Sequence, residues 1–305
     1  MARLVHAGQA LVDAVIEVER LPETGGDVMA SASALHAGGA VNVLVAAARA
    51  GGDAVHAGAH GTGPFGDLIR AAFAREHIVA ASPPIADSDT GLCVVLVEPS
   101  AERTFVTTQG AERRLSVDTL RAAGVEAGDY VCVTGYTLLH ETSGRALLDW
   151  LPEMPADAHL VLDPGALFGD VPSARRAAVV ERTSLWTSNR DEAAELCGLD
   201  DPAAAAPAVA TLLGGAAVVV RDGERGCVVH ADGRTTPVPG FPVRAIDTNG
   251  AGDAHIGTIV AERCRGTDWV AAARRANAAA AIKVTRRGPA TAPTRAEVDA
   301  FLAGR

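Results

Sequence analysis

The chain has 305 residues, of which 48% are hydrophobic and only 4% aromatic, and its formal net charge is −10. This acidic balance offers no basic stripe to neutralise phosphates, which argues against a general nucleic-acid surface or a membrane surface. The five cysteines are widely spaced and form no C-x-x-C pair, so they indicate neither a disulfide framework nor a zinc site.

The N-terminal part mixes strand patterns with one helix. Asp13 and Glu17 interrupt the first apolar stretch, and no 18-residue apolar run follows, so we expect a soluble cytoplasmic protein. Strands are predicted at residues 4–7, 11–18, 28–35 and 54–59, and helices at residues 42–50 and 67–76.

Two β-type stretches, residues 91–97 and 103–108, are separated by a segment with hairpin chemistry. Together with the early strands they predict a small sheet that covers a site. We expect one domain over residues 1–305, with lid strands contributed by about 11–36 and 90–110. An edge hairpin without a covering role is the alternative.

From Tyr130 onward, predicted strands alternate with predicted helices. The strands are residues 131–134, 160–163, 185–187 and 217–221, and the helices are residues 143–150, 173–181, 191–197, 206–213, 251–264, 269–284 and 295–302. Such alternation predicts an α/β fold with a mostly parallel central sheet and helices on both faces, which is a three-layer α/β/α arrangement.

The strongest local signal is the segment 247–253, D-T-N-G-A-G-D, where an apolar strand pattern breaks into a Gly-rich turn before an Ala-rich helix. Backbone N–H groups at such a helix start suit a phosphate group. Gly250, Ala251 and Gly252 let it approach closely, and Asp253 lies beside it as a proton acceptor. The alternative is a turn whose Asp253 only favours the helix start. No Walker-type loop is present, because no Lys follows these glycines.

This segment resembles the D-T-x-G-A-G-D signature of the ribokinase-like (PfkB) carbohydrate kinases, and the resemblance extends over nearly the whole chain. Residues 37–42 (A-G-G-A-V-N) resemble the G-G-x-x-x-N substrate segment of that family, and residues 58–67 its first glycine-rich signature. Residues 189–192 (N-R-D-E) resemble its N-x-x-E motif. Asn277 and residues 286–294 resemble the stretch that encloses adenine.

The resemblance implies the ribokinase-like fold, ATP and Mg²⁺ as cofactors, and a role for each matching residue. Asp253 would be the base and residues 250–252 the anion hole. The other implied residues are Asp13, Gly38, Gly39 and Asn42 for the substrate, and Asn189, Glu192, Arg221, Gly223, Gly226 and Asn277 for ATP, with Glu192 reaching Mg²⁺ through water. Asp247 and the carbonyl of Asn249 would hold a monovalent cation such as K⁺, or Asp247 would only cap the turn.

Several positions depart from the family pattern. Gly39 stands where ribokinase itself has a sugar-contacting Lys, so ribose need not be the substrate. Arg221 replaces a common Thr, and a guanidinium could still pair with phosphate. His255 replaces a common Phe; a packed His is a commoner outcome than a catalytic one. The pairs Gly135-Tyr136 and His140-Glu141 follow a predicted strand at the sheet end where ligands bind, so we expect one of these residues at the substrate, with Glu141 as the candidate.

We therefore expect an ATP-dependent kinase that phosphorylates a hydroxyl of a sugar or sugar-like molecule. A nucleoside kinase of the same family and a catalytically silent ligand-binding regulator are the alternatives. The expected partners are a small-molecule sugar or nucleoside and a second copy of the chain, joined through the lid, with no nucleic acid and no membrane.

Overall fold

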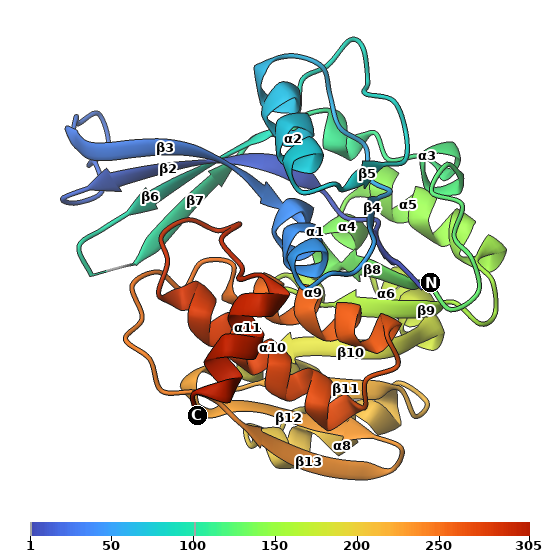
Figure 1. Ribbon diagram of the computed structural model, residues 1–305. Helices are drawn as coiled ribbons and strands as arrows, with labels where there is room; N and C mark the ends of the chain where they lie inside the picture. The colour runs from blue at the N-terminus through green and yellow to red at the C-terminus, as the bar shows by residue number, and fades with distance from the viewer. Residues whose placement is uncertain (1, 101) are drawn as a thin grey trace.

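The computed structural model describes residues 2–100 and 102–305. Figure 1 shows a body built on a large sheet, from which a smaller sheet extends as an arm. Among the described residues, no helix is long and apolar enough to cross a membrane.

The large sheet has the strand order β13-β12-β11-β10-β9-β8-β1-β4-β5. Its strands are β1 (Leu4–His6), β4 (Ala54–His56), β5 (Val79–Ala80), β8 (Tyr130–Thr134), β9 (His159–Asp163), β10 (Thr183–Asn189), β11 (Ala217–Arg221), β12 (Gly226–Ala231) and β13 (Arg234–Pro239). Neighbours from β5 to β11 pair in parallel, whereas β12 and β13 are antiparallel. The predicted mostly parallel sheet is confirmed.

The β12–β13 hairpin was absent from the sequence-based prediction. Its turn is Asp232-Gly233, and both residues have positive φ, 51° and 71°. An Asp-Gly pair with this geometry joins tightly paired antiparallel strands. The Asp-Gly dipeptide alone would therefore have predicted this hairpin.

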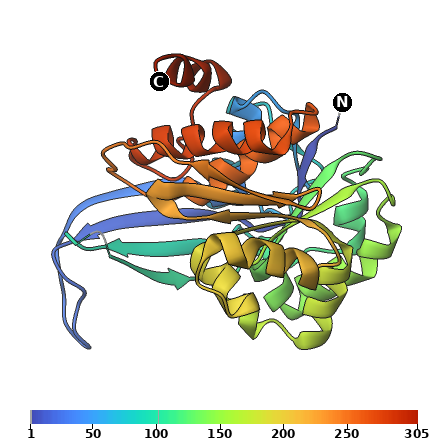
Figure 2. The same ribbon diagram turned by 90° about the horizontal axis from the view of Figure 1, so that it is seen from below.

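Two helical layers cover the faces of the large sheet (Figure 2). The helices are α1 (Ala40–Arg49), α2 (Pro64–Arg75), α3 (Val117–Arg121), α4 (Gly135–Leu139), α5 (Glu141–Trp150), α6 (Ser173–Arg182), α7 (Arg190–Cys197), α8 (Pro202–Leu212), α9 (Ala251–Cys264), α10 (Trp269–Val284) and α11 (Arg295–Ala303). In β11, Val219 packs with α1, α2, α9 and α10, whereas Val218 and Val220 pack with α3 and α5–α8. Alternate strand residues thus supply two separate cores.

Most predicted helices begin within a few residues of the observed ones, and α8 is an exception. It was predicted from residue 206 but begins at Pro202. The Asp201 side chain accepts a hydrogen bond from Ala203 N at 3.3 Å, and Pro202 occupies the first turn, where its missing N–H costs nothing. The capping pair starts the helix one turn earlier than the apolar pattern indicated.

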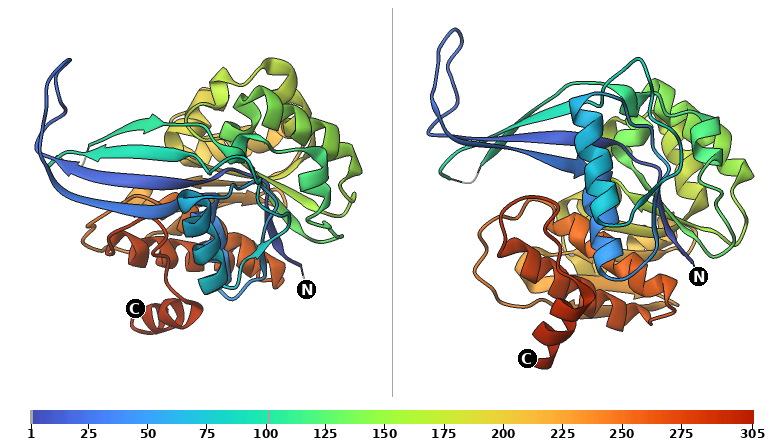
Figure 3. Two further views of the ribbon diagram at one scale, coloured as in Figure 1. Left: turned by 90° about the horizontal axis from the view of Figure 1, so that it is seen from above. Right: turned by 45° about the horizontal axis from the view of Figure 1, so that its top comes forward.

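The smaller sheet, called the lid below, contains β2 (Ala10–Val18), β3 (Ala30–Gly39), β6 (Leu92–Val97) and β7 (Arg103–Thr107). Its order is β3-β2-β6-β7, with β2 and β6 parallel and the outer pairs antiparallel. β6 and β7 fall within the predicted segment 90–110, whereas β2 begins one residue before the predicted segment 11–36 and β3 ends three residues after it. Figure 3 shows the sheet extending beyond the body. Since side chains alternate along a strand, Asp13, Val15 and Glu17 share one face of β2.

Parallel pairing brings the carboxyl ends of β9, β10 and β11 to one edge of the large sheet. Those strands end at Asp163, Asn189 and Arg221. Ligands in open α/β sheets bind at this edge. The candidate site is built there.

Candidate active site

The turn before α9 has the shape that its glycines predicted. Gly250 has a φ of 76°, and a β-carbon there would lie 2.5 Å from the Pro289 carbonyl oxygen. A residue with a side chain would therefore be strained and would clash with the chain. Gly252 and Asp253 follow in the first helical turn, where no preceding helical carbonyl is available to their N–H groups. This end of α9 can bind an anion.

Asp253 is held by Asn42 of α1, 211 residues away in the chain. Asn42 Nδ2 donates a hydrogen bond of 2.9 Å to Asp253 Oδ2. Burial raises the pKa of Asp253, while Asn42, Arg221 and Lys283 counteract the rise. Asn42 Oδ1 is buried and finds no hydrogen-bond partner among the described residues. That oxygen remains able to accept a hydrogen bond from a ligand.

Asp13 lies against the Gly38-Gly39 segment, since β2 and β3 are paired. A β-carbon on Gly38 would lie 2.2 Å from Asp13 Oδ2, so only glycine leaves room for this carboxyl. Burial raises the pKa of Asp13 to about 7, with a further contribution from the negative charge of Asp253. The structure therefore brings the predicted base and the predicted sugar-binding acid within electrostatic reach of each other.

Arg221, at the end of β11, extends over the start of α9. Its Nη1 donates a 2.8 Å hydrogen bond to Thr187 Oγ1, and its Nη2 lies 3.8 Å from Glu192 Oε2. A β-carbon on Gly252 would be 3.5 Å from Arg221 Nη2. A guanidinium in this position adds a fixed positive charge to the anion-binding turn.

Acidic oxygen donors surround Arg221. Asn189 and Glu192 form a capping box at the start of α7, in which Asn189 Oδ1 accepts from Glu192 N and Glu192 Oε2 accepts from Asn189 N, both at 2.8 Å. Burial raises the pKa of Glu192, and it raises that of Asp163 to about 6. The positive charge near these two carboxylates is too small to offset the rise in their pKa values. Carboxylate oxygens are hard donors, which Mg²⁺ prefers.

Among the described residues, no group of three or more His, Cys, Asp or Glu side chains could hold a metal ion by itself. Mg²⁺ often keeps several waters and is bound through one or two carboxylates plus substrate phosphates. The residues present therefore fit a Mg²⁺ ion that arrives with a nucleotide, with Glu192 and Asp163 as the nearby carboxylates.

Asn277 and His255 form a buried pair behind the turn. Asn277 Nδ2 donates to the carbonyl oxygens of Val238 (3.0 Å) and Pro239 (3.2 Å), and its Oδ1 lies 3.1 Å from His255 Nε2. These contacts fix the end of β13, which lies against Gly226 at the start of β12. Burial lowers the pKa of His255 to about 3, so a neutral imidazole packs there. A role of Asn277 in binding ATP stays a prediction.

Gly223 lies in the turn between β11 and β12, and Gly226 is the first residue of β12; their φ values are positive, 58° and 100°. Glu141, at the start of α5, lies elsewhere: its side chain is 78% exposed and forms an ion pair with Arg175. Within residues 2–100 and 102–305, Glu141 makes no hydrogen bond or ion pair with Asp13, Asn42 or Asp253. Its predicted contact with a substrate stays a prediction.

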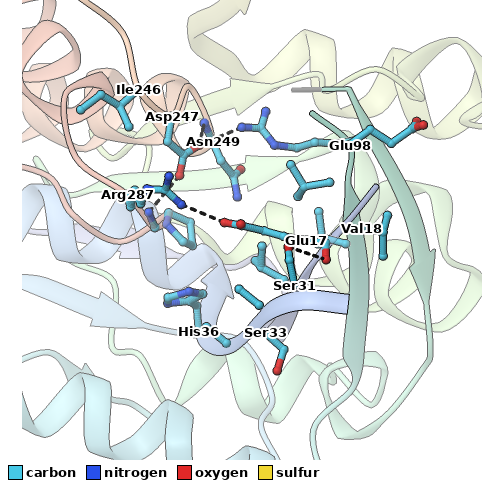
Figure 4. A pocket seen from close by; sticks show the side chains of 18 of the residues that line it. Glu17, Val18, Ser31, Ser33, His36, Glu98, Ile246, Asp247, Asn249 and Arg287 are labelled. Atoms are coloured by element: carbon cyan, nitrogen blue, oxygen red, sulfur yellow. Dashed lines mark hydrogen bonds and ion pairs between the residues drawn. The ribbon is translucent and has the colours of Figure 1, made fainter. Parts of the chain in front are cut away.

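A cavity of about 600 Å³ lies between the lid and the body (Figure 4). Glu17, Ser31, Ser33 and His36 line it from the lid. From the body it is lined by Ile246, Asp247, Asn249 and the segment 287–289. Two ion pairs cross it: Arg103 Nη2 to Asp247 Oδ1, and Arg287 Nη1 to Glu17 Oε1, each at 2.8 Å. The lid is thus tied to the body beside the turn.

Asp247 accepts more hydrogen bonds than the sequence predicted. Its Oδ1 accepts from Asn249 N at 2.9 Å, and its Oδ2 accepts from Gly288 N at 2.9 Å. Its carbonyl oxygen accepts a 2.8 Å hydrogen bond from Nζ of Lys283, a fully buried residue of α10. These contacts act as a turn cap and also hold a cationic side chain beside the anion-binding turn.

A sequence profile described as pfkB family carbohydrate kinase matches residues 1–295. The chain belongs to this family. Carbohydrate kinases transfer a phosphate group to an alcohol group of their substrate, so the predicted class of enzyme is confirmed.

Individual relatives agree with the family assignment. The uncharacterised sugar kinase YegV of Escherichia coli is 32% identical over 95% of this kinase and 91% of its own length. The ATP-dependent ribose-1-phosphate kinase of Halopiger xanaduensis is 28% identical over 100% of this chain and 99% of its own length. The crystal structure of ribokinase from Thermotoga maritima superposes with a TM-score of 0.81 at 23% identity, covering 99% of this chain and 100% of that one. The ribokinase-like fold is confirmed.

Two residues of the candidate site, Arg103 and Lys283, were missed at the sequence level. Arg103 stands at a strand end, and only the assembled sheets bring it to the turn. One sequence feature could have drawn attention to Lys283: of the 27 Lys and Arg residues, it is the single lysine.

Proposed function

We propose that this kinase transfers the γ-phosphate of ATP to a hydroxyl of a sugar or sugar-like molecule, with Asp253 as the general base. One observation carries the proposal. The Asp253 carboxylate is fixed by Asn42 in the first turn of α9, beside N–H groups that would stabilise the transferring phosphoryl group. A base and an anion hole at one place are what hydroxyl phosphorylation needs.

The acceptor would be oriented by polar groups opposite the anion hole. The free Asn42 Oδ1 and the Asp13 carboxyl can each accept a hydrogen bond from a hydroxyl. With one hydroxyl bound in this way, the next lies where Asp253 can take its proton as the oxygen attacks phosphorus. Such positioning accounts for much of the rate in phosphoryl transfer.

The nucleotide would lie along the carboxyl edge of the sheet. Arg221 would pair with phosphate oxygens, and Asn277, Gly223 and Gly226 would shape the turn on which the nucleotide rests. Mg²⁺ bound with the nucleotide would neutralise phosphate charge, held through water by Glu192 and Asn189. Closure of the lid would exclude water that could otherwise accept the phosphate.

The cavity between the lid and the body lies beside the proposed acceptor site, since Asp13, Asn42 and Asp253 are not among its lining residues, and its side chains suit a sugar better than a nucleoside. No phenyl, phenol or indole ring is among the described side chains that line it, whereas Ser31, Ser33 and Glu17 offer hydrogen-bonding groups. A nucleobase would find no such ring on which to stack. The intact Asp253 and its anion-binding turn argue against a catalytically silent regulator.

We also propose that two copies pair through their lids. Leu35, Phe105 and Val106 are 52–59% exposed and lie on β3 and β7, the two edge strands of the lid. Exposed edges and apolar side chains favour association. Sedimentation at micromolar concentration would give a dimer; a monomer would contradict this part.

ADP release from ATP and Mg²⁺, measured across a panel of sugars, sugar phosphates and nucleosides, tests the activity. We expect turnover with a sugar-type acceptor and a loss of at least about 10³-fold in kcat for Asp253→Asn, since the base is removed while the side chain keeps its shape. Asp191→Asn, an exposed change near the same edge, is the control. Tight ATP binding without turnover on any acceptor would overturn the proposal.

A further inference from the structure

Lys283 is unusual in composition and in position. The chain has 27 basic residues, of which 26 are Arg and this one is Lys. Its side chain is 0% exposed. Lysine is almost never fully buried unless it is paired. In a chain whose other basic side chains are arginines, the one lysine ammonium therefore lies in the interior, directly behind the turn that carries Asp253.

The ammonium contacts the first residue of the D-T-N-G-A-G-D segment. Lys283 Nζ lies 2.8 Å from the Asp247 carbonyl oxygen and 4.0 Å from Asp247 Oδ2. Burial lowers the pKa of Lys283, and the nearby carboxylates of Asp247 and Asp253 counteract this. The same charge counteracts the rise that burial causes in the pKa of Asp253. Its field therefore reaches the proposed base.

The three oxygens of Asp247, from which a cation site would be built, are already used. Asp247 Oδ1 accepts from Asn249 N and Arg103 Nη2, and Oδ2 accepts from Gly288 N. At the end of α10, the Val284 carbonyl accepts from Ile246 N at 2.7 Å and from Asp247 N at 3.0 Å. A bare cation would have to displace these donors.

The local charge also opposes a further cation. The single carboxylate of Asp247 faces two cationic side chains, Arg103 at 2.8 Å and Lys283 at 4.0 Å. Like charges a few ångströms apart repel by several kcal/mol at an interior dielectric of about 20. Asp247 and Asn249, expected from the family resemblance to hold K⁺, therefore do not fit an added monovalent cation in this structure.

We propose that the Lys283 ammonium takes the place of a monovalent cation beside the anion hole, so that this kinase works without K⁺. Lys283 is then a positioning residue: it anchors the Asp247 carbonyl, keeps the turn in shape and supplies one fixed positive charge. The inference rests on the kinase activity proposed above.

The first experiment uses the unmodified protein. Initial rates are compared in chlorides of K⁺, Na⁺ and tetramethylammonium at one ionic strength, and melting temperatures in the same salts without substrate. We expect kcat to differ by less than about twofold and the melting temperature to be the same in all three. A rise in kcat of more than about fivefold in K⁺, or a melting temperature raised specifically by K⁺, would overturn the inference.

The second experiment alters the side chain. Lys283→Ala opens space for a small cation, whereas Lys283→Met removes the charge and fills the space. We expect both to lose at least about 30-fold in kcat with a smaller change in the KM for ATP. K⁺ or ethylammonium should restore at least about tenfold to Lys283→Ala and nothing to Lys283→Met. Arg274→Met, which removes an exposed cation from the same helix, should behave like the unmodified protein.

These outcomes separate the two proposals. If no acceptor is phosphorylated in any salt, the proposed function fails, while the melting temperatures still test Lys283. K⁺ should then stabilise Lys283→Ala relative to tetramethylammonium and leave the unmodified protein unchanged. Equal loss in Ala and Met variants, with no rescue and no stabilisation by any cation, would mean that Lys283 is a packing residue and would overturn the inference.

Discussion

Replacing Asp13 by Asn should stabilise the protein while it removes activity. The pKa of this carboxyl is raised from 3.8 to about 7, chiefly by burial. Between those values the folded protein holds a proton that the unfolded chain releases, so the stability falls as the pH rises from about 4 to about 7. Above pH 7 the whole penalty is present. Asn cannot ionise, so the variant does not bear the cost of burying a charged carboxylate.

The size of the effect follows from the shift. About three pKa units at about 1.4 kcal/mol each give an upper limit of about 4 kcal/mol. Because Asp13 keeps some exposure and is coupled to Asp253, we expect about half of this, or about 2 kcal/mol. For a chain of this length, that raises the melting temperature by about 3 °C at pH 8. At pH 5 the gain should shrink to about 1 °C, since most of the penalty is absent there.

The assay is thermal unfolding of the ligand-free protein at pH 5 and pH 8, followed by circular dichroism. Asp200→Asn, an exposed change after α7, is the matched control and should shift neither curve. In parallel, kcat/KM of Asp13→Asn should fall at least about 100-fold, since a carboxylate that accepts hydroxyl hydrogen bonds is lost. Destabilisation at pH 8, or an equal gain at both pH values, would refute the reasoning.

Further outcomes follow from the same site. Gly250→Ala should lose more than about 2 kcal/mol of stability, because a left-handed alanine costs about 1–2 kcal/mol and its β-carbon would meet the Pro289 carbonyl at 2.5 Å; an unchanged denaturation midpoint would contradict this. Arg103→Met should loosen the lid and raise the KM of the sugar about fivefold with little change in kcat, corresponding to about 1 kcal/mol for one partly exposed ion pair; a fall in kcat alone would argue against a lid contact. Glu192→Gln should raise the Mg²⁺ concentration for half-maximal activity about tenfold, whereas an unchanged Mg²⁺ titration would remove Glu192 from the metal's surroundings.

The sequence alone was sufficient for features that depend on neighbouring residues. The strand–helix alternation predicted the parallel sheet because its period is local, and the D-T-N-G-A-G-D run predicted a turn that only glycine at 250 can make. The strands predicted at residues 11–18 and 91–97 were found at 10–18 and 92–97 for the same reason. These features depend on few contacts between residues that lie far apart in the sequence.

The tertiary structure decided which side chains meet. Asn42 reaches Asp253 across 211 residues, and Arg103 and Lys283 reach Asp247 from different sheets and helices. No local pattern encodes such pairs, because they arise when separate elements pack against one another. For the same reason no local pattern predicts the ion pair of Glu141 with Arg175, and the environment that raises the pKa of a carboxyl exists only once the core has formed around it.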